Sequence, residues 1–349
     1  MSRRARYTFL ACSERSGSNL ITRVMDSHSA CCGPSPTHLY RYLLDFRSRY
    51  GDLANPDPWH RMVEDAVRLF DSKLGNWRAR VTAIELHANV RDRGVAGIAS
   101  YIYEKELRLS GKRALFIKEN HLWRHMGFFR AAYPEARFVF FVRDPRDMAL
   151  SWKRAPNLRG CTLRAARVWQ SDQAGTLRQL RDPATAERTT IVRYEDLLAA
   201  PEPTLRSLCG FLGLEYEPGM TALDRNASAV ADASALKEWE NLKRPLLAGN
   251  AGKFRAALSE DEIAFIETHC REEMVALGYT PLTERAGDAA RLAERLAPLE
   301  IHEKPAYREQ PAADRRRQER RAAVVARIAA RPVVRDDRPE APKPSASPV

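Results

Sequence analysis

A loop rich in serine and glycine separates the first apolar segment of the chain from a segment with helical spacing. The loop spans residues 12–20 and reads CSERSGSNL. Glycine and serine leave backbone N–H groups free to bind an anion, and the N-terminus of the following helix adds a partial positive charge. Arg15, Ser16 and Ser18 supply further hydrogen-bond donors. The composition therefore predicts a cradle for a phosphate or a similar anion.

This loop differs from the phosphate-binding loop of most ATPases and kinases. The pattern G-x-x-x-x-G-K-[ST] is absent, and with it the lysine on which such loops depend. The sequence also lacks a clear acidic pair after a strand that would bind Mg²⁺. A nucleotide-binding kinase is therefore the alternative enzyme class. Because short strings of serine and glycine are also typical of solvated turns, the loop needs a second feature to support it.

That second feature follows the most strongly predicted strand, Arg137–Val142 (RFVFFV). The next ten residues read RDPRDMALSW, with Arg143 at the carboxyl end of the strand and Ser151 eight residues later, about two helical turns on. A guanidinium and a hydroxyl that converge on one anion suit a phosphate monoester. The alternative is an ion pair of Arg143 with Asp144 at the surface and a serine on an ordinary helix face.

Strands and helices alternate around these two segments. The other predicted strands are Tyr7–Cys12, Ala114–Ile117 and Thr189–Val192; the predicted helices are Asn19–Asp26, Leu122–Ala132, one that contains Met148–Lys153, Glu202–Leu212 and Ser259–Leu277, the last opening with a capping box. This order predicts an α/β fold of three layers, in which helices flank a central parallel sheet. Such sheets bind ligands at the carboxyl ends of their strands, where both segments lie.

Taken in order, the segments resemble those of the PAPS-dependent sulfotransferases, where PAPS is 3′-phosphoadenosine-5′-phosphosulfate. RSGSNL is similar to their 5′-phosphosulfate loop, and FVFFVRDPRDMALSW is similar to their 3′-phosphate motif. The resemblance continues through IVRYEDL (191–197), Pro201, FLGL (211–214), GKFR (252–255), Leu258-Ser259 and LGY (277–279). It covers residues 6–280 and implies a P-loop-NTPase-like sulfotransferase fold, with PAPS as co-substrate and no metal.

The resemblance also implies roles for individual residues. The 5′-phosphosulfate would be held by Arg15, Ser16, Gly17, Ser18, Asn19 and Leu20; the 3′-phosphate by Arg143 and Ser151; the adenine would lie near Tyr194; and a late loop with Gly252, Lys253 and Arg255 would close over the 3′-phosphate. Many members place a lysine near the bridging oxygen where this chain has Arg15. Related tyrosyl and carbohydrate enzymes carry arginine there, so Arg15 is also expected to act in catalysis.

Sulfuryl transfer needs a cation at the leaving oxygen and a base for the acceptor hydroxyl or amine. Lys118, after the strand Ala114–Ile117, matches a lysine placed similarly in the family and is the expected cation. For the base we prefer His38, because similar enzymes place a glutamate near its position. His121 is the second candidate and Glu119 the third. A histidine that only makes structural hydrogen bonds remains the alternative for either ring.

Charge and composition limit the classes of partner that we expect the protein to bind. The net charge of +12 favours an anionic partner, but the basic run DRRRQERR is interrupted by acids and is more typical of a solvated helix face than of nucleic-acid binding. We therefore expect a small-molecule or glycan acceptor and no nucleic acid. Residues 40–106 are rich in His, Trp and Tyr and are expected to form the acceptor cleft: Trp59, His60, Trp77, His87, Tyr101 and Tyr103.

The sequence predicts two parts of unequal order. Residues 1–283 form the expected catalytic domain, and residues 284–349 form a charged, proline-rich tail that we expect to be largely disordered apart from a helix over Asp314–Ala330. Removal of this tail is expected to leave folding and nucleotide binding intact. With no apolar run that spans a bilayer, no recognisable signal peptide and six cysteines without paired spacing, the protein is expected to be cytoplasmic with reduced, buried thiols.

Overall fold

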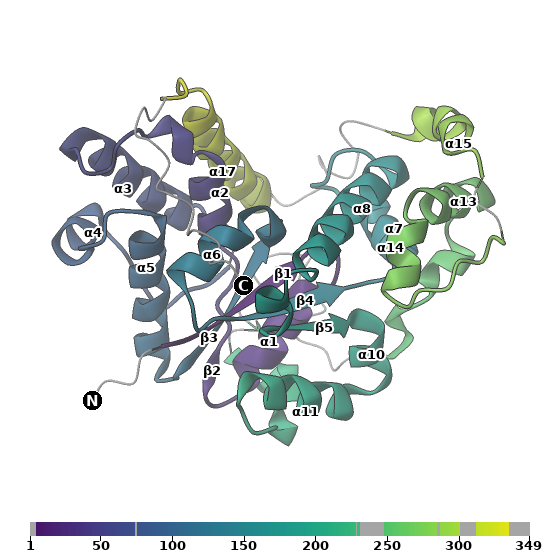
Figure 1. Cartoon of the computed structure of the whole chain (residues 1–349), viewed down its shortest axis with the longest axis horizontal. Coiled ribbons are helices and arrows are strands. Elements are labelled where there is room, and N and C mark those ends of the chain that lie inside the picture. The colour runs from purple at the N-terminus through teal and green to yellow at the C-terminus, as the bar shows by residue number, and fades with distance from the viewer. Residues whose placement is uncertain are drawn as a thin grey trace, which may run out of the picture.

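A sheet of five parallel strands forms the centre of the protein in the computed structural model, which describes residues 5–73, 75–227, 229–230, 248–284, 287–300 and 312–334. The strands lie in the order β2-β3-β1-β4-β5. Their bounds are Arg6–Cys12 (β1), Cys31–Cys32 (β2), Ala114–Asn120 (β3), Arg137–Val142 (β4) and Thr189–Arg193 (β5). The four expected strands are present, and the short β2 is an addition. The predicted α/β fold with a parallel sheet between helices is confirmed (Figure 1).

One face of the sheet is covered by α1 (Ser18–Ser27), α10 (Tyr194–Ala199) and α11 (Pro201–Leu212). In α1 the buried residues Ile21, Val24 and Met25 recur at spacings of three and four, which places them on one side of the helix. They pack against Leu10 of β1 and Phe116 of β3 in one continuous core. This layer fixes the direction in which the loop between β1 and α1 leaves the sheet.

The opposite face carries a larger layer of helices. It consists of α2 (Leu39–Asp45), α3 (Pro56–Asp71), α4 (Ala83–Asn89), α5 (Val95–Ser110) and α6 (Met126–Ala132). Phe9 and Ile117 of the sheet contribute to this core. Trp59 and Tyr103, which we expected in an acceptor cleft, are buried in it, so their rings support the fold of this layer.

A third cluster of helices lies beyond the carboxyl end of β4. It contains α7 (Pro145–Arg154), α8 (Thr162–Gln179), α13 (Glu260–His269), α14 (Arg271–Ala276) and α15 (Ala289–Leu296). The predicted capping box of Ser259 and Glu262 is present at the start of α13. Arg146 joins α7 to α13 through buried ion pairs with Asp144 and Glu267, both at 2.6 Å. The short α9 (Pro183–Ala186) precedes β5.

The C-terminal region differs from the expected disordered tail where the structure describes it. The predicted helix is present as α17 (Ala312–Ala329), which lies beside α2 and α3 (Figure 1), and α15 was not anticipated. Ile328 of α17 is fully buried in the core of the larger layer, and Leu296 of α15 is buried in the third cluster. Because both helices bury apolar side chains against the catalytic domain, removal of residues 284–349 would expose parts of two cores. This packing argues against the expectation that folding survives the truncation, which stays a prediction.

Charged contacts also hold the end of α17. The carboxylate of Asp65 in α3, which is inaccessible to solvent, pairs with Arg331 and lies 3.4 Å from Arg327. Tyr50 donates a hydrogen bond of 3.0 Å to the same carboxylate. The backbone N–H of Val334 donates to the carbonyl of Ser48 at 2.8 Å. Since a buried carboxylate without partners is costly, these contacts couple α17 to α3.

None of the described helices is long and apolar enough to cross a membrane. All six cysteines are buried and unpaired, as the sequence predicts.

Replacing Arg331 with glutamine should destabilise the fold, because Asp65 loses a cationic partner while staying buried. A hydrogen bond to a charged group contributes about 1.5–3 kcal/mol, and we expect the free energy of unfolding in urea to fall by that amount. Arg320→Gln, at an exposed position of α17, should change it by less than about 0.5 kcal/mol. Equal urea midpoints for the two variants would show that α17 does not stabilise the core.

Candidate active site

The loop between β1 and α1 adopts the curved backbone expected of an anion cradle. Arg15 and Gly17 both have left-handed backbone, with φ of 63° and 86°. Turns of this kind point successive N–H groups into one concavity. A β-carbon on Gly17 would lie 2.5 Å from the ring of Tyr194, so only glycine fits there. The hydroxyl of Ser16 is buried without a hydrogen-bond partner, which fits a ligand that bonds to it.

The structure brings this loop together with the segment after β4. The guanidinium of Arg143 donates to the carbonyl of Arg15 and to that of Asn250, both at 3.2 Å, and its Nε is buried without a partner. Arg15 Nε donates to Ser151 Oγ at 3.1 Å. Arg143 is therefore held by neutral carbonyl groups, which leaves its charge for an anionic ligand. In place of the alternative, an ion pair of Arg143 and Asp144, the structure pairs Asp144 with Arg146.

Tyr194, the first residue of α10, closes this side of the site. The guanidinium carbon of Arg143 lies 4.4 Å from the centre of its ring, and Asn250 Nδ2 donates to its hydroxyl at 2.6 Å. Asn250 was not among the residues predicted from the sequence. An aromatic ring that already stacks on a cation offers a flat apolar edge where a base could pack.

The late loop reaches the site through its backbone. Asp147 of α7 accepts hydrogen bonds from the N–H groups of Gly252 at 2.5 Å and Phe254 at 3.0 Å. The side chains of Lys253 and Arg255 are exposed, and Arg255 lies against the ring of Phe254 at 5.2 Å. Their assignment to the 3′-phosphate stays a prediction.

The end of β3 presents two ionisable side chains to opposite layers. Lys118 faces α1 and donates to Asn19 Oδ1 at 2.7 Å, while burial lowers the pKa of this lysine. Glu119 faces α2, where its Oε1 accepts from the backbone N–H of Tyr40 at 3.3 Å. Burial raises the pKa of Glu119 to about 8, so this carboxyl group is mostly protonated at neutral pH.

His38 lies next to Glu119. Its Nδ1 is 3.7 Å from Glu119 Oε2, and neither atom has a hydrogen-bond partner although both are buried. Burial first, and then the cations Arg321, Lys118 and Arg41, hold the pKa of His38 well below its usual range. The ring is therefore neutral at pH 7 and able to accept a proton.

Comparison with known proteins identifies the family. The family model described as "Sulfotransferase family" matches residues 8–218, well over half of the chain. The chain belongs to the sulfotransferase family. The matched residues contain both anion-binding segments and the end of β3 with Lys118 and Glu119, whereas the late loop and α17 lie outside them.

The curated relatives match this sulfotransferase over different shares of its length. Nodulation protein NoeE of Sinorhizobium fredii is 24% identical over 307 residues, which is 80% of this chain and 68% of that protein. Carbohydrate sulfotransferase 1 of Danio rerio is 33% identical over 41% of this chain and 38% of its own length. Carbohydrate sulfotransferase 2 of Mus musculus is 34% identical over 26% of this chain, and the match covers 16% of that protein.

Solved structures support the fold of the sulfotransferase. The sulfotransferase domain from the curacin biosynthetic pathway superimposes with a TM-score of 0.53 at 19% identity, over 80% of this chain and 99% of that domain. The sulfotransferase domain from the Synechococcus PCC 7002 olefin synthase gives 0.52 at 19% identity, over 80% and 98%. These similarities show that the helices and strands are arranged as in a sulfotransferase.

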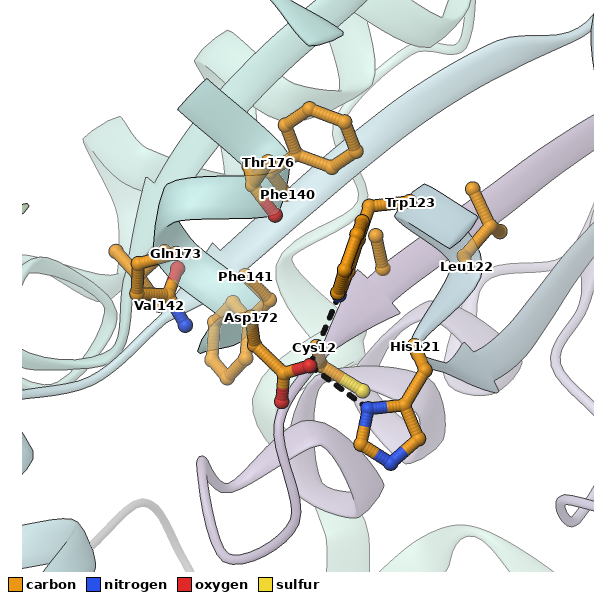
Figure 2. A pocket seen from close by; sticks show the side chains of 11 residues that line it. Cys12, His121, Leu122, Trp123, Phe140, Phe141, Val142, Asp172, Gln173 and Thr176 are labelled. Atoms are coloured by element: carbon orange, nitrogen blue, oxygen red, sulfur yellow. Dashed lines mark hydrogen bonds and ion pairs between the residues drawn. The ribbon is translucent and has the colours of Figure 1, made fainter. Parts of the chain in front are cut away.

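His121 of the sulfotransferase is held by carboxylates on both sides. Its Nδ1 lies 2.7 Å from Asp172 Oδ1, an oxygen that also accepts from Trp123 Nε1 at 3.0 Å (Figure 2). Its Nε2 is 3.7 Å from Glu14 Oε1. Although burial favours the neutral ring, the two carboxylates raise the pKa of His121 to about 9. A ring that is already protonated at neutral pH cannot serve as the base.

Asp172 of α8 links two loops of the site. Its Oδ2 accepts from Ser13 Oγ at 2.8 Å, and Gln173 Nε2 donates to the same hydroxyl at 3.1 Å. A small enclosed cavity of about 10 Å³ adjoins this cluster, and Asp172, His121 and Trp123 are among its lining residues (Figure 2). It has room for one water molecule, so it belongs to the support of the loop rather than to the substrate site.

Backbone strain marks the same region. Among the described residues, the non-glycine residues with positive φ are Arg15, His38 and His121, at 63°, 53° and 57°. They lie in the loops after β1, β2 and β3. Left-handed backbone is unfavourable for such residues and persists where the surrounding structure requires it.

The described residues contain no cluster of three or more groups that could hold a metal ion.

The charge on His121 can be measured directly. We expect its ring to titrate near pH 9 in an NMR titration of the histidine ring protons. Asp172→Asn removes one of its two carboxylates and should lower this pKa by about 1–2 units, the equivalent of one charge-assisted hydrogen bond. Asp45→Asn, which changes the 2.8 Å partner of His125 instead, should leave His121 unaffected. A titration of His121 near pH 6.5 in the unchanged protein would return it to the candidates for the base.

Proposed function

We propose that this sulfotransferase transfers a sulfuryl group from PAPS to a hydroxyl of a carbohydrate or another small molecule. The observation that carries the proposal is the convergence of Arg15, Arg143 and Ser151, from segments more than a hundred residues apart, on one place at the carboxyl end of the sheet. Such an arrangement of donors suits a nucleotide with more than one anionic group.

Buried groups without partners fit this donor. Ser16 Oγ and Arg143 Nε are both buried with no hydrogen bond in the protein, and burial of unpaired polar atoms is unfavourable unless a ligand bonds to them. Ser16 lies in the loop assigned to the 5′-phosphosulfate, and Arg143 in the segment assigned to the 3′-phosphate. Tyr194 stacks beside Arg143 and would flank the adenine.

Lys118 and Arg15 would act at the oxygen of PAPS that is released when the sulfuryl group is transferred. When bound, PAPS supplies the sulfuryl group, and negative charge develops on the oxygen that is released. Lys118 is buried and oriented by Asn19, which belongs to the helix that starts at the phosphosulfate loop. A cation that is already oriented in a site with little water stabilises developing charge without reorganisation.

His38 and Glu119 would act together on the acceptor. The imidazole accepts the hydroxyl proton at Nε2 when Nδ1 carries the other proton and faces an ionised Glu119. The separation of 3.7 Å is longer than a hydrogen bond, and contacts of this kind commonly tighten when substrate binds. The pair titrates as a unit, so its proton affinity belongs to both groups.

The names of the curated relatives support a glycan acceptor. Two of the relatives named above are called carbohydrate sulfotransferases. The surface near α3 and α4 presents His60 and His87, whose rings lie 4.4 Å apart. Such polar rings are compatible with binding of sugar hydroxyls.

Arg143→Ala and Ser151→Ala should weaken binding of adenosine 3′,5′-bisphosphate much more than binding of adenosine 5′-phosphate. Loss of a charge-assisted bond of about 1.5–3 kcal/mol predicts an increase of tenfold or more in Kd for the arginine variant. Isothermal titration of both nucleotides checks this. Arg154→Ala, at an exposed position of α7, should have no effect. Equal losses for both nucleotides would place the 3′-phosphate elsewhere.

Replacing His38 with alanine should lower kcat by about 10²–10⁴, because the acceptor proton loses its base. Affinity for adenosine 3′,5′-bisphosphate should barely change, since His38 lies outside both anion-binding segments. The rate is measured with ³⁵S-labelled PAPS and an acceptor found by screening. His121→Ala should reduce kcat less than His38→Ala does. The opposite order would assign the base to His121.

The pH dependence of kcat/KM should show the titration of Glu119. In the unchanged enzyme kcat/KM should rise as pH increases through about 8, because the His38–Glu119 pair carries an extra proton below that pH. Glu119→Gln should have a lower rate, and its kcat/KM should no longer rise around pH 8. The reason is that His38, whose pKa is depressed, is neutral both below and above that pH. A limb near pH 8 that survives in Glu119→Gln would show that another group titrates there.

A further inference from the structure

The C-terminal helix α17 places an arginine at the acceptor side of the site. Arg321 is buried, with an exposed fraction of 8%. Its Nη2 donates to the carbonyl of Thr37, the residue before His38. Its guanidinium carbon lies 5.2 Å from the centre of the Tyr42 ring in α2. The docking contacts of Ile328, Arg327 and Arg331 with the larger layer fix the helix that carries it.

Polar atoms without partners gather around this arginine. Arg321 Nη1 is buried and makes no hydrogen bond. The same holds for His38 Nδ1 and Glu119 Oε2, and for Arg41 Nε and Glu14 Oε2 in the neighbouring ion pair of 3.4 Å. Buried polar atoms are nearly always hydrogen-bonded in native proteins. These five atoms, from two helices, two loops and strand β3, indicate a polar ligand that supplies the missing bonds.

The charges of this region show what kind of ligand fits. Arg41 is compensated by Glu14 and by Asp45, at 3.4 Å and 3.9 Å. Glu14 is ionised, because His121 and Arg41 outweigh the effect of burial and hold its pKa below the usual range. Glu119 is the carboxyl group that Arg321 acts on, and burial keeps it mostly protonated at neutral pH. In the resting enzyme at neutral pH, Arg321 is therefore a buried cation that acts on a mostly neutral carboxyl group, and this favours an incoming anion.

We propose that Arg321 of α17 binds an anionic substituent of the acceptor, so that the enzyme prefers an acidic glycan over a neutral one. Nη1 donates to the anionic oxygen, while Nη2 stays on the Thr37 carbonyl and keeps the guanidinium in place. This contact would hold the acceptor hydroxyl beside His38. The proposal rests on the proposed function, since it assigns Arg321 to the acceptor of the same reaction.

Three glycosides that differ at one carbon test the proposal. They are 4-nitrophenyl β-D-glucoside, its 6-sulfate and 4-nitrophenyl β-D-glucuronide, titrated into the full chain saturated with adenosine 3′,5′-bisphosphate. The unchanged protein should bind at least one of the anionic glycosides tenfold or more tightly than the neutral one. In Arg321→Gln the affinities should agree within about twofold. Arg320→Gln, at the adjacent exposed position, should keep the full preference.

Several results would overturn the proposal. They are equal affinities for the three glycosides in the unchanged protein, absence of binding by both anionic ones, or a preference that survives in Arg321→Gln. Folding is checked in each variant by circular dichroism and by Kd for adenosine 3′,5′-bisphosphate, which should be unchanged because Arg321 lies away from the donor segments. If that nucleotide fails to bind the unchanged protein, the proposal that PAPS is the sulfuryl donor is refuted instead. The two proposals can therefore fail separately.

Discussion

The alternation of side chains at the end of β3 is the constraint on which the site depends. Successive residues of a strand point to opposite faces of a sheet. Lys118 therefore faces the layer of α1, where the anion-binding loop begins, and Glu119 faces the layer of α2, where His38 lies. A single strand thus places the cation Lys118 on one side of the site and the His38–Glu119 pair, which we propose as the base, on the other. A shift of one residue in the pairing of β1 with β3 would exchange the two groups and abolish this division.

Buried charge distinguishes the two histidines that the sequence could not separate. Both lie in loops at the same edge of the sheet, and both have left-handed backbone. His121 contacts the carboxylates of Asp172 and Glu14, which outweigh the effect of burial, raise the pKa of its ring to about 9 and hold it as a cation. Burial and then the cations around it hold the pKa of His38 well below its usual range, so its ring is neutral. The same ring therefore serves as structural support in one loop and as a candidate base in the other.

Sequence reasoning succeeded where the chemistry lies next to a strand. The loop after β1 and the segment after β4 were assigned from residue types and from their position after apolar runs, and the structure brings Arg15, Arg143 and Ser151 together. It did not find Asp172, Gln173 or Asn250, because these residues act through contacts across more than fifty positions and lie in no recognisable pattern. It also placed Trp59 and Tyr103 in a cleft, although their size and apolar neighbours put them in the core.

The sequence predicts the C-terminal helix but not its contacts with the rest of the protein. Alanine and arginine on α17 give a weakly apolar sequence, which is typical of a solvated helix. The helix is nevertheless held at a few positions by strong local contacts: Ile328 is buried, Arg331 pairs with the inaccessible Asp65, and Arg321 extends to the carbonyl beside His38. The partners of these residues are more than 250 positions away, so the sequence around α17 carries no sign of them. A helix that docks through single side chains thus places one of them, Arg321, at the loop that carries His38.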